Sequence, residues 1–129
     1  MMLRQLYFTT IVCLCLIHSN HLTAQNRYDV VLTEIMSDPA PQIGLPNFEW
    51  IEIKNTSSSP INLQGWRVGD GSGVSGALPN FILQPDSNAI ICGTTGAATM
   101  QQFGRTFGVT SFPSLDNDGE LLFIRSNTG

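Results

Sequence analysis

Histidine and cysteine are scarce in this chain, and the positions of the few that occur are informative. The 129 residues contain two histidines and three cysteines. Cys13, Cys15, His18 and His21 lie close to the N-terminus, and Cys92 is the third cysteine. Serine and cysteine triads need a histidine base, and most zinc sites need several His or Cys ligands. The sequence after His21 therefore excludes both kinds of site.

Lysine and arginine are also few. The chain has six basic and ten acidic residues, which gives a formal net charge of −4. Binding to nucleic acid depends on clustered Lys and Arg that neutralise phosphates. The basic residues here are scattered along an acidic chain, so we expect no direct binding to nucleic acid.

The N-terminus has the pattern of an export signal. Arg4 supplies a positive charge, and Leu6–Ile17 is a largely apolar run of 12 residues. A helix that spans a membrane needs about 20 apolar residues, so this run is too short to be one. Ala24 is a small residue before Gln25, as signal cleavage requires. The sequence predicts a signal peptide over residues 1–24, cleaved near Ala24, and a protein that is secreted or on the cell surface.

Residues 25–129 are expected to form one domain with a modest core. This part has a formal net charge of −5, because Arg4 is the only Lys or Arg before residue 25. We expect no transmembrane segment in it. Cys92 ends the apolar run Ala89–Cys92, which predicts a buried small hydrophobic side chain. Pairing with a thiol outside this sequence is the alternative.

The rest of the chain reads as strands and turns. Its apolar stretches are short and are bounded by Gly, Pro, Asn, Asp and Ser, which indicates an all-β sandwich or barrel. No strand is predicted within Gly93–Gly108, where Ala97–Phe103 is expected to form at most one helical turn. The predicted strands are Tyr28–Met36, Glu49–Asn55, Ile61–Leu63, Trp66–Gly69, Phe81–Leu83, Ala89–Cys92 and Glu120–Arg125.

The clearest strand pattern lies in residues 49–54. Ile51 and Ile53 alternate with Trp50, Glu52 and Lys54. Alternate residues of a strand project to opposite faces, so the pattern predicts a sheet with one buried face.

The C-terminal end predicts a missing partner strand. Leu121-Leu122-Phe123-Ile124 places apolar side chains on both faces of one strand, so we expect both faces to be covered. The sequence then ends at the turn signal Asn127-Thr128-Gly129. We therefore expect the domain to be incomplete at its C-terminus.

Gly71-Ser72-Gly73-Val74-Ser75-Gly76 matches the string G-x-G-x-x-G. A dinucleotide site needs this loop to end a strand and open a helix, whose N-terminus holds the pyrophosphate. Pro79 follows too closely for a helix to begin there. The motif is predicted to be a flexible loop between strands.

Acidic residues that could bind calcium are clustered in the segment Asp116-Asn117-Asp118-Gly119-Glu120. An EF-hand loop with Gly119 as its sixth residue would begin at Ser114 and end at Arg125, where neither residue is an acidic ligand. Asp-Gly before a strand is instead typical of a hairpin turn. A weak calcium site at Asp116 and Asp118 is the alternative, and it would make thermal melting depend on calcium.

Glycosidases use a pair of carboxylates, and the chain has acidic residues that could form one. Glu34 and Asp38, or Glu49 and Glu52, are candidates by residue type alone. Glu49 and Glu52 project to opposite faces of one strand, so they cannot flank one bond. The sequence therefore predicts no catalytic residue, no cofactor and no metal ligand, and a protein that is not an enzyme.

An ordered set of segments resembles the lamin tail domain over about residues 28–129. The resemblance implies an immunoglobulin-like β-sandwich that lacks its last one or two strands in this sequence. It also implies a tethering or interaction module of the kind found in large secreted or surface bacterial proteins, sometimes beside nucleases or phosphoesterases. The segments are Val31–Pro39, Gly44–Pro46, Glu49–Asn55, Pro60–Val68, Leu83–Asp86 and Ser114–Glu120.

Within such a sandwich several residues are expected to have structural roles. Glu34 and Glu52 are expected to cap backbone groups or to pair with Lys54 or Arg67. The predicted core residues are Ile51, Ile53, Leu63, Trp66, Leu122 and Ile124.

Three functions follow as hypotheses. The favoured one is a secreted, non-catalytic module that binds a protein or cell-surface component and tethers a larger protein through domains further along the same chain. The second is an accessory domain of a secreted nuclease or phosphoesterase whose catalytic domain lies downstream. The third is an adhesion module that calcium stabilises through Asp116 and Asp118.

Overall fold

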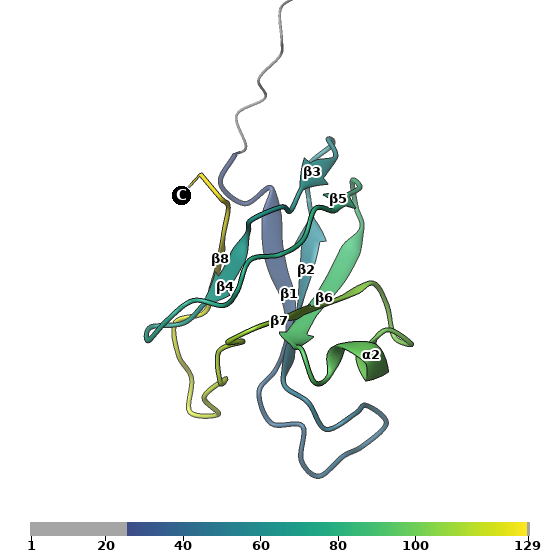
Figure 1. Ribbon diagram of the computed structural model, residues 1–129, viewed down its shortest axis with the longest axis vertical. Helices are drawn as coiled ribbons and strands as arrows, with labels where there is room; N and C mark the ends of the chain where they lie inside the picture. The colour runs from purple at the N-terminus through teal and green to yellow at the C-terminus, as the bar shows by residue number, and fades with distance from the viewer. Residues whose placement is uncertain (1–25, 129) are drawn as a thin grey trace, which may run out of the picture.

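The computed structural model describes residues 26–128, so the predicted signal peptide lies outside the described residues. The described part is nearly all β, as the sequence predicted (Figure 1). No helix in residues 26–128 is long and apolar enough to cross a membrane. The elements are β1 (Val30–Met36), β2 (Trp50–Asn55), β3 (Ile61–Asn62), β4 (Arg67–Gly69), β5 (Ile82–Leu83), β6 (Asn88–Gly93), α2 (Ala97–Met100), β7 (Thr106–Val109) and β8 (Phe123–Arg125).

The strands form two layers. One layer is a four-stranded sheet in the order β1-β2-β6-β7, in which β6 and β7 are parallel and the other pairs are antiparallel. The other layer consists of two antiparallel pairs, β3–β5 and β4–β8. Figure 1 shows these pairs lying across the larger sheet. The arrangement is a β-sandwich.

The main core lies between the two layers. Ile51 and Ile53 of β2 are fully buried and belong to one cluster with Leu63, Val68 and Leu83 from the opposite layer. Each side chain of this kind contributes about 1.5–3 kcal/mol to the free energy of unfolding when it is withdrawn from water. The alternation in β2 thus positions the core as the sequence predicted.

The other face of β2 is also covered at one end, which the sequence did not predict. Trp50 was expected to face away from the core, yet only 6% of its surface is exposed. It packs with Ile90, Cys92 and Met100 in a second cluster. Met100 comes from α2, so the short helix shields the end of the sheet that a simple alternation pattern leaves open to solvent.

The segment Gly93–Gly108 contains a strand, so the prediction that it has none was wrong. β7 pairs in parallel with β6, and such a partner gives no local turn signal. Its strand pattern is interrupted by Gly108, a residue with low strand propensity. A Cβ atom at Gly108 would lie 2.7 Å from the Cβ atom of Ala97, so the glycine lets α2 approach the sheet. The helical turn expected within Ala97–Phe103 is confirmed as α2.

The last predicted strand is shorter than expected. The sequence predicted Glu120–Arg125, but β8 begins at Phe123. Leu121 is 67% exposed, so the expectation that both faces of this segment are covered was wrong. Leu122 and Ile124, predicted as core residues, are half-buried and pack against the edge of the main core.

Trp66 provides a direct test of the core. Its side chain is 5% exposed in the main cluster. Trp66→Ala should lower the free energy of unfolding by about 3–5 kcal/mol, because it leaves a large cavity. Urea denaturation measures the change. Ile43→Ala, at a side chain that is 84% exposed, is the control and should stay within about 0.5 kcal/mol of the wild type. Equal stability of the two variants would place Trp66 outside the core.

Candidate functional site

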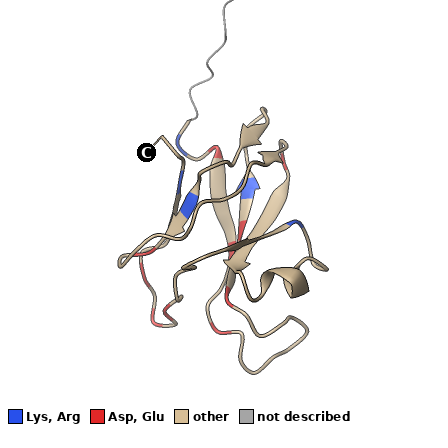
Figure 2. Ribbon diagram, in the orientation of Figure 1, with Lys and Arg blue, Asp and Glu red and all other residues tan. Residues whose placement is uncertain are grey.

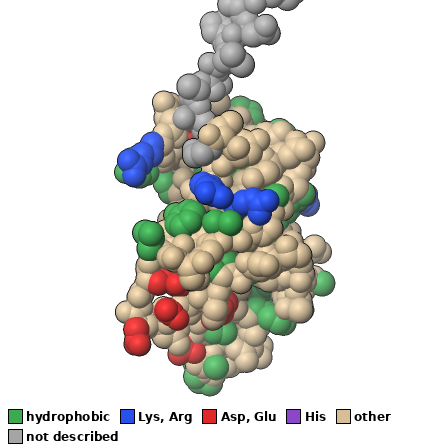
Figure 3. Space-filling model, turned by 60° about the vertical axis from the view of Figure 1, so that its left-hand side comes forward, with side chains coloured by type: hydrophobic (Ala, Val, Ile, Leu, Met, Phe, Trp, Pro, Cys, Tyr) green, Lys and Arg blue, Asp and Glu red, His purple; other side chains and the backbone are tan. Residues whose placement is uncertain are grey.

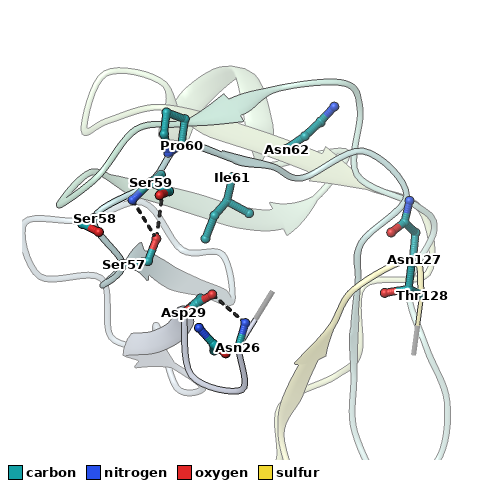
Figure 4. Close-up of a pocket in the computed structure, with 10 residues that line it drawn as sticks. All are labelled: Asn26, Asp29, Ser57, Ser58, Ser59, Pro60, Ile61, Asn62, Asn127 and Thr128. Atoms are coloured by element: carbon teal, nitrogen blue, oxygen red, sulfur yellow. Dashed lines mark hydrogen bonds between the residues drawn. The ribbon is translucent and has the colours of Figure 1, made fainter. Parts of the chain in front are cut away.

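A polar cavity of about 620 Å³ lies at one end of the sandwich (Figure 4). Three segments far apart in the sequence meet there: the residues before β1, the loop between β2 and β3, and the residues after β8. Figure 4 shows Ile61 projecting into the space between these segments. We call this hollow the polar cavity. It is lined by Asn26, Asp29, Ser57, Ser58, Ser59, Pro60, Ile61, Asn62, Asn127 and Thr128.

Asn55 does not line the polar cavity itself but holds the loop that lines one side of it. Its side chain is fully buried, and Nδ2 donates to the carbonyl oxygens of Ser59 at 2.8 Å and Leu83 at 2.9 Å. Its Oδ1 accepts from the backbone N–H of Ser57 at 2.9 Å. Asn55 begins the sequon Asn-Thr-Ser, but both of its N–H groups are occupied in the fold. A glycan on this side chain is incompatible with the native structure.

The polar cavity can form hydrogen bonds but holds no activated nucleophile. The carboxylate of Asp29 accepts from the backbone N–H of Asn26 at 2.7 Å. Ser57 Oγ lies 2.8 Å from Asn55 Oδ1 and 2.9 Å from the carbonyl oxygen of Ser59 (Figure 4 shows the latter). Neither partner is a base that could take the hydroxyl proton. Sequence reasoning missed these residues, because Asn, Asp and Ser are also the ordinary residues of turns.

A second hollow, of about 540 Å³, lies beside β4 and the segment that precedes β8. Asp70, Asp116 and Glu120 line it together with the exposed apolar side chains Val74 and Leu121. We call it the acidic cleft. The sequence indicates a possible calcium site at Asp116–Glu120 but gives no such indication for Asp70. The fold brings Asp70 to the same hollow.

Asp70 organises the glycine-rich loop. Its Oδ1 accepts from the backbone N–H groups of Ser72 and Gly73, each at 2.7 Å, and from Ser72 Oγ at 2.8 Å. These bonds, led by the one from the Ser72 hydroxyl, hold the pKa of Asp70 below its ordinary value. The motif that begins at Gly71 follows β4 and precedes β5, so the prediction of a loop between strands is confirmed.

The Asp-Gly turn is confirmed as a turn but not as a hairpin, because β7 before it and β8 after it belong to different sheets. Gly119 has a φ of +96°, and its N–H donates to the carbonyl oxygen of Asp116 at 3.2 Å. Glu120 Oε1 accepts from the backbone N–H of Asp116 at 2.9 Å. Within residues 26–128, no three His, Cys, Asp or Glu side chains come together as a metal site would require. The calcium hypothesis therefore gains no support from this turn.

Three other acidic residues form hydrogen bonds to backbone groups or across strands. Glu49 Oε2 accepts from the backbone N–H of Leu115 at 3.2 Å. Glu52 Oε1 accepts from Thr33 Oγ1 at 2.8 Å and from Asn88 Nδ2 at 2.7 Å, which links three neighbouring strands. Asp38 Oδ1 accepts from the backbone N–H of Ala40 at 3.3 Å.

The expected ion pairs of Glu34 and Glu52 do not form. Lys54 Nζ instead lies 2.6 Å from Asp86 Oδ1. This contact, first through the hydrogen bond and then through the charge of Lys54, lowers the pKa of Asp86. Arg67 Nη1 donates to the carbonyl oxygen of Ser75 at 2.5 Å. Lys54 and Arg67 each bind a residue that a turn brings close. The alternation of residues along a strand does not predict such a contact.

Cys92 is a buried hydrophobic residue, as predicted. It is 0% exposed and belongs to the second cluster with Trp50. Burial raises the pKa of its thiol, which keeps the thiol protonated and unreactive.

Comparison with known families assigns the chain to a family. The sequence model of the lamin tail domain matches residues 23–129. The chain belongs to the lamin tail domain family. No curated protein matches it.

Family membership confirms the resemblance and the fold expected from the sequence. A lamin tail domain is an immunoglobulin-like β-sandwich, and the two layers described above agree with it. The family consists of non-catalytic, immunoglobulin-like domains that act as interaction modules. The polar cavity and the acidic cleft are therefore candidate binding surfaces of a lamin tail domain.

The lowered pKa of Asp70 predicts how the stability of this lamin tail domain depends on pH. The pKa of Asp70 is lower in the folded chain than the ordinary value of 3.8, so the unfolded chain binds the proton first as the pH falls. The carboxylate therefore stabilises the fold above that value, and the contribution is lost as the pH falls through the folded pKa. In Asp70→Asn, the free energy of unfolding should vary less with pH between about 4 and 2.

Urea denaturation at a series of pH values measures this effect. Asp118→Asn removes the same charge at an exposed position of a neighbouring loop and is the matched control. If Asp70→Asn and the wild type lose stability in parallel as the solution is acidified, the hydrogen bonds to Asp70 contribute nothing to the native state.

Proposed function

We propose that this chain is a secreted, non-catalytic interaction and tethering module of a larger extracellular or cell-surface protein. The observation that carries the proposal is the apolar rim of the acidic cleft. Leu121 is 67% exposed and Val74 is 39% exposed, and both line the cleft. Neighbouring exposed apolar side chains surrounded by polar groups are typical of protein–protein contacts.

The uses of the acidic residues also favour binding over catalysis. A general acid or base must reach a substrate, and two such groups must flank the reacting bond. Glu49, Glu52 and Asp70 are instead occupied by bonds to neighbouring backbone and side-chain groups. This supports a module that presents a surface.

Secretion and tethering are supported by the N-terminal signal and by the family resemblance. Secretion follows from the signal peptide predicted over residues 1–24. A place within a larger surface protein follows from the tethering role that the resemblance implies for bacterial domains of this kind. A protein or cell-surface component is the partner that a cleft with apolar and acidic groups fits.

Export is directly testable. When the full chain is produced with a C-terminal tag in a bacterial secretion host, the exported protein should begin near Gln25, because Ala24 is the small residue before the cut. N-terminal sequencing identifies the first residue. Ala24→Leu should hinder cleavage at that position. Recovery of a cytoplasmic chain that still begins at Met1 would contradict secretion, and hydrolysis of phosphodiesters by the purified exported chain would contradict a non-catalytic role.

Tethering is tested at the acidic cleft. The exported wild-type chain should remain with the cell-surface fraction, and Leu121→Lys should release it into the medium, because a charge replaces an exposed apolar contact. Quantitative immunoblotting of both fractions measures the distribution. Ile82→Lys changes a side chain that is 43% exposed and lies outside the cleft, so it should be retained like the wild type. Equal release of both variants would remove the cleft from the proposal.

A further inference from the structure

Two arginines stand directly opposite each other on the pair β4–β8. The antiparallel register pairs Arg67 with Arg125, and Figure 2 shows the two basic positions side by side on neighbouring strands. Residues paired in this way project from the same face, with Cβ atoms about 4.5–5.5 Å apart. The next pair, Val68 and Ile124, packs into the main core, so Arg67 and Arg125 face outward.

Neither arginine has a carboxylate partner among the described residues, where the one ion pair joins Lys54 and Asp86. Arg67 is half-buried and donates to the carbonyl oxygen of Ser75. Arg125 is exposed, and the structure gives its side chain no hydrogen bond within residues 26–128. Like charges directly opposite each other on a sheet destabilise it. An anion bound between the two guanidinium groups would reverse that effect.

An aromatic residue lies on the same outward face as the two arginines. Phe123 pairs with Gly69, one step along the outward face of β4 and β8. A Cβ atom at Gly69 would lie 2.5 Å from Phe123 Cζ, so the ring occupies the space above the glycine. The outward surface formed by Arg67, Arg125 and Phe123 thus combines two guanidinium groups with an apolar surface. We call it the arginine face.

The charges around the arginine face limit what it can bind. Asp116, Asp118 and Glu120 are all exposed in the loop that precedes β8. Figure 3 shows basic side chains on this side of the molecule, with hydrophobic ones beneath them and acidic ones lower still. A long polyanion such as nucleic acid would meet the acidic loop and would find only two arginines to neutralise its phosphates. A short segment with a few carboxylates avoids this repulsion.

We propose that the arginine face binds an acidic peptide segment of a partner protein. Carboxylates of the segment would bind the guanidinium groups of Arg67 and Arg125, whose planar donors match a carboxylate in a bidentate way. An apolar residue of the segment would lie against Phe123. The proposal rests on the proposed interaction role and names the chemistry of the partner, at a surface distinct from the rim of the acidic cleft.

Binding is tested with the purified exported chain and fluorescein-labelled peptides at low ionic strength. The probe is a peptide of alternating Asp and Glu around one Leu, and the control peptide carries Asn and Gln in their place. Fluorescence anisotropy should show binding of the acidic peptide only, weakened by salt. Arg125→Gln should weaken it about tenfold, and Arg125→Lys should be intermediate, because it keeps the charge but loses the planar donors.

Arg27→Gln is the matched control, because Arg27 is an exposed arginine that contacts the ring of Tyr28 and lies outside the arginine face. It should leave affinity unchanged, and melting curves should show that all variants are folded. Equal loss in Arg27→Gln and Arg125→Gln would reduce the effect to net charge and overturn the proposal. Tighter binding of an oligothymidylate than of the peptide would overturn it in favour of nucleic acid. If the peptide does not bind while Leu121→Lys still abolishes surface retention, the arginine face is wrong and the interaction role stands.

Discussion

The burial of β2, along its core-facing side and at Trp50 on the other side, is the constraint on which the rest of this lamin tail domain depends. The strand pairs with β1 on one side and β6 on the other, so its backbone groups are satisfied within the sheet. Ile51 and Ile53 enter the main core, while Trp50 enters the second cluster beneath α2. At its end, Asn55 ties the following loop to Leu83 in the opposite layer. One strand thereby holds together both layers, the helix and the wall of the polar cavity.

Because the core is filled by apolar side chains, the groups that could bind a partner lie on the surface of the molecule. The polar cavity offers hydrogen-bonding groups, and the acidic cleft joins carboxylates to exposed apolar side chains. The arginine face carries two guanidinium groups that have no carboxylate partner within residues 26–128. The acidic loop at residues 116–120 precedes β8, which carries Arg125 of the arginine face, and Figure 3 shows basic and acidic side chains separated on one side of the molecule. This separation of charge suits recognition of a partner with complementary segments, and it agrees with a family of non-catalytic interaction modules.

Features set by neighbouring residues were predictable from the sequence. The alternation of Ile51 and Ile53 located the main core, the Asp-Gly pair at Asp118 located a turn, and the apolar run before Cys92 indicated a buried thiol. Each depends on local periodicity or on the backbone freedom of one residue, and both can be read without knowing the fold. The ordered motifs were sufficient for the family and hence for the sandwich.

Features that depend on distant contacts were not predictable in this way. β7 exists because β6 provides a parallel partner, Trp50 is buried because α2 folds over it, and Leu121 is exposed because β8 begins only at Phe123. The candidate sites have the same origin, since the polar cavity joins residues as far apart as Asn26 and Thr128. The sequence by itself determined most of the strands, the turns and the family through short-range patterns. Only the tertiary structure decided which side chains meet, because long-range packing and strand register place them.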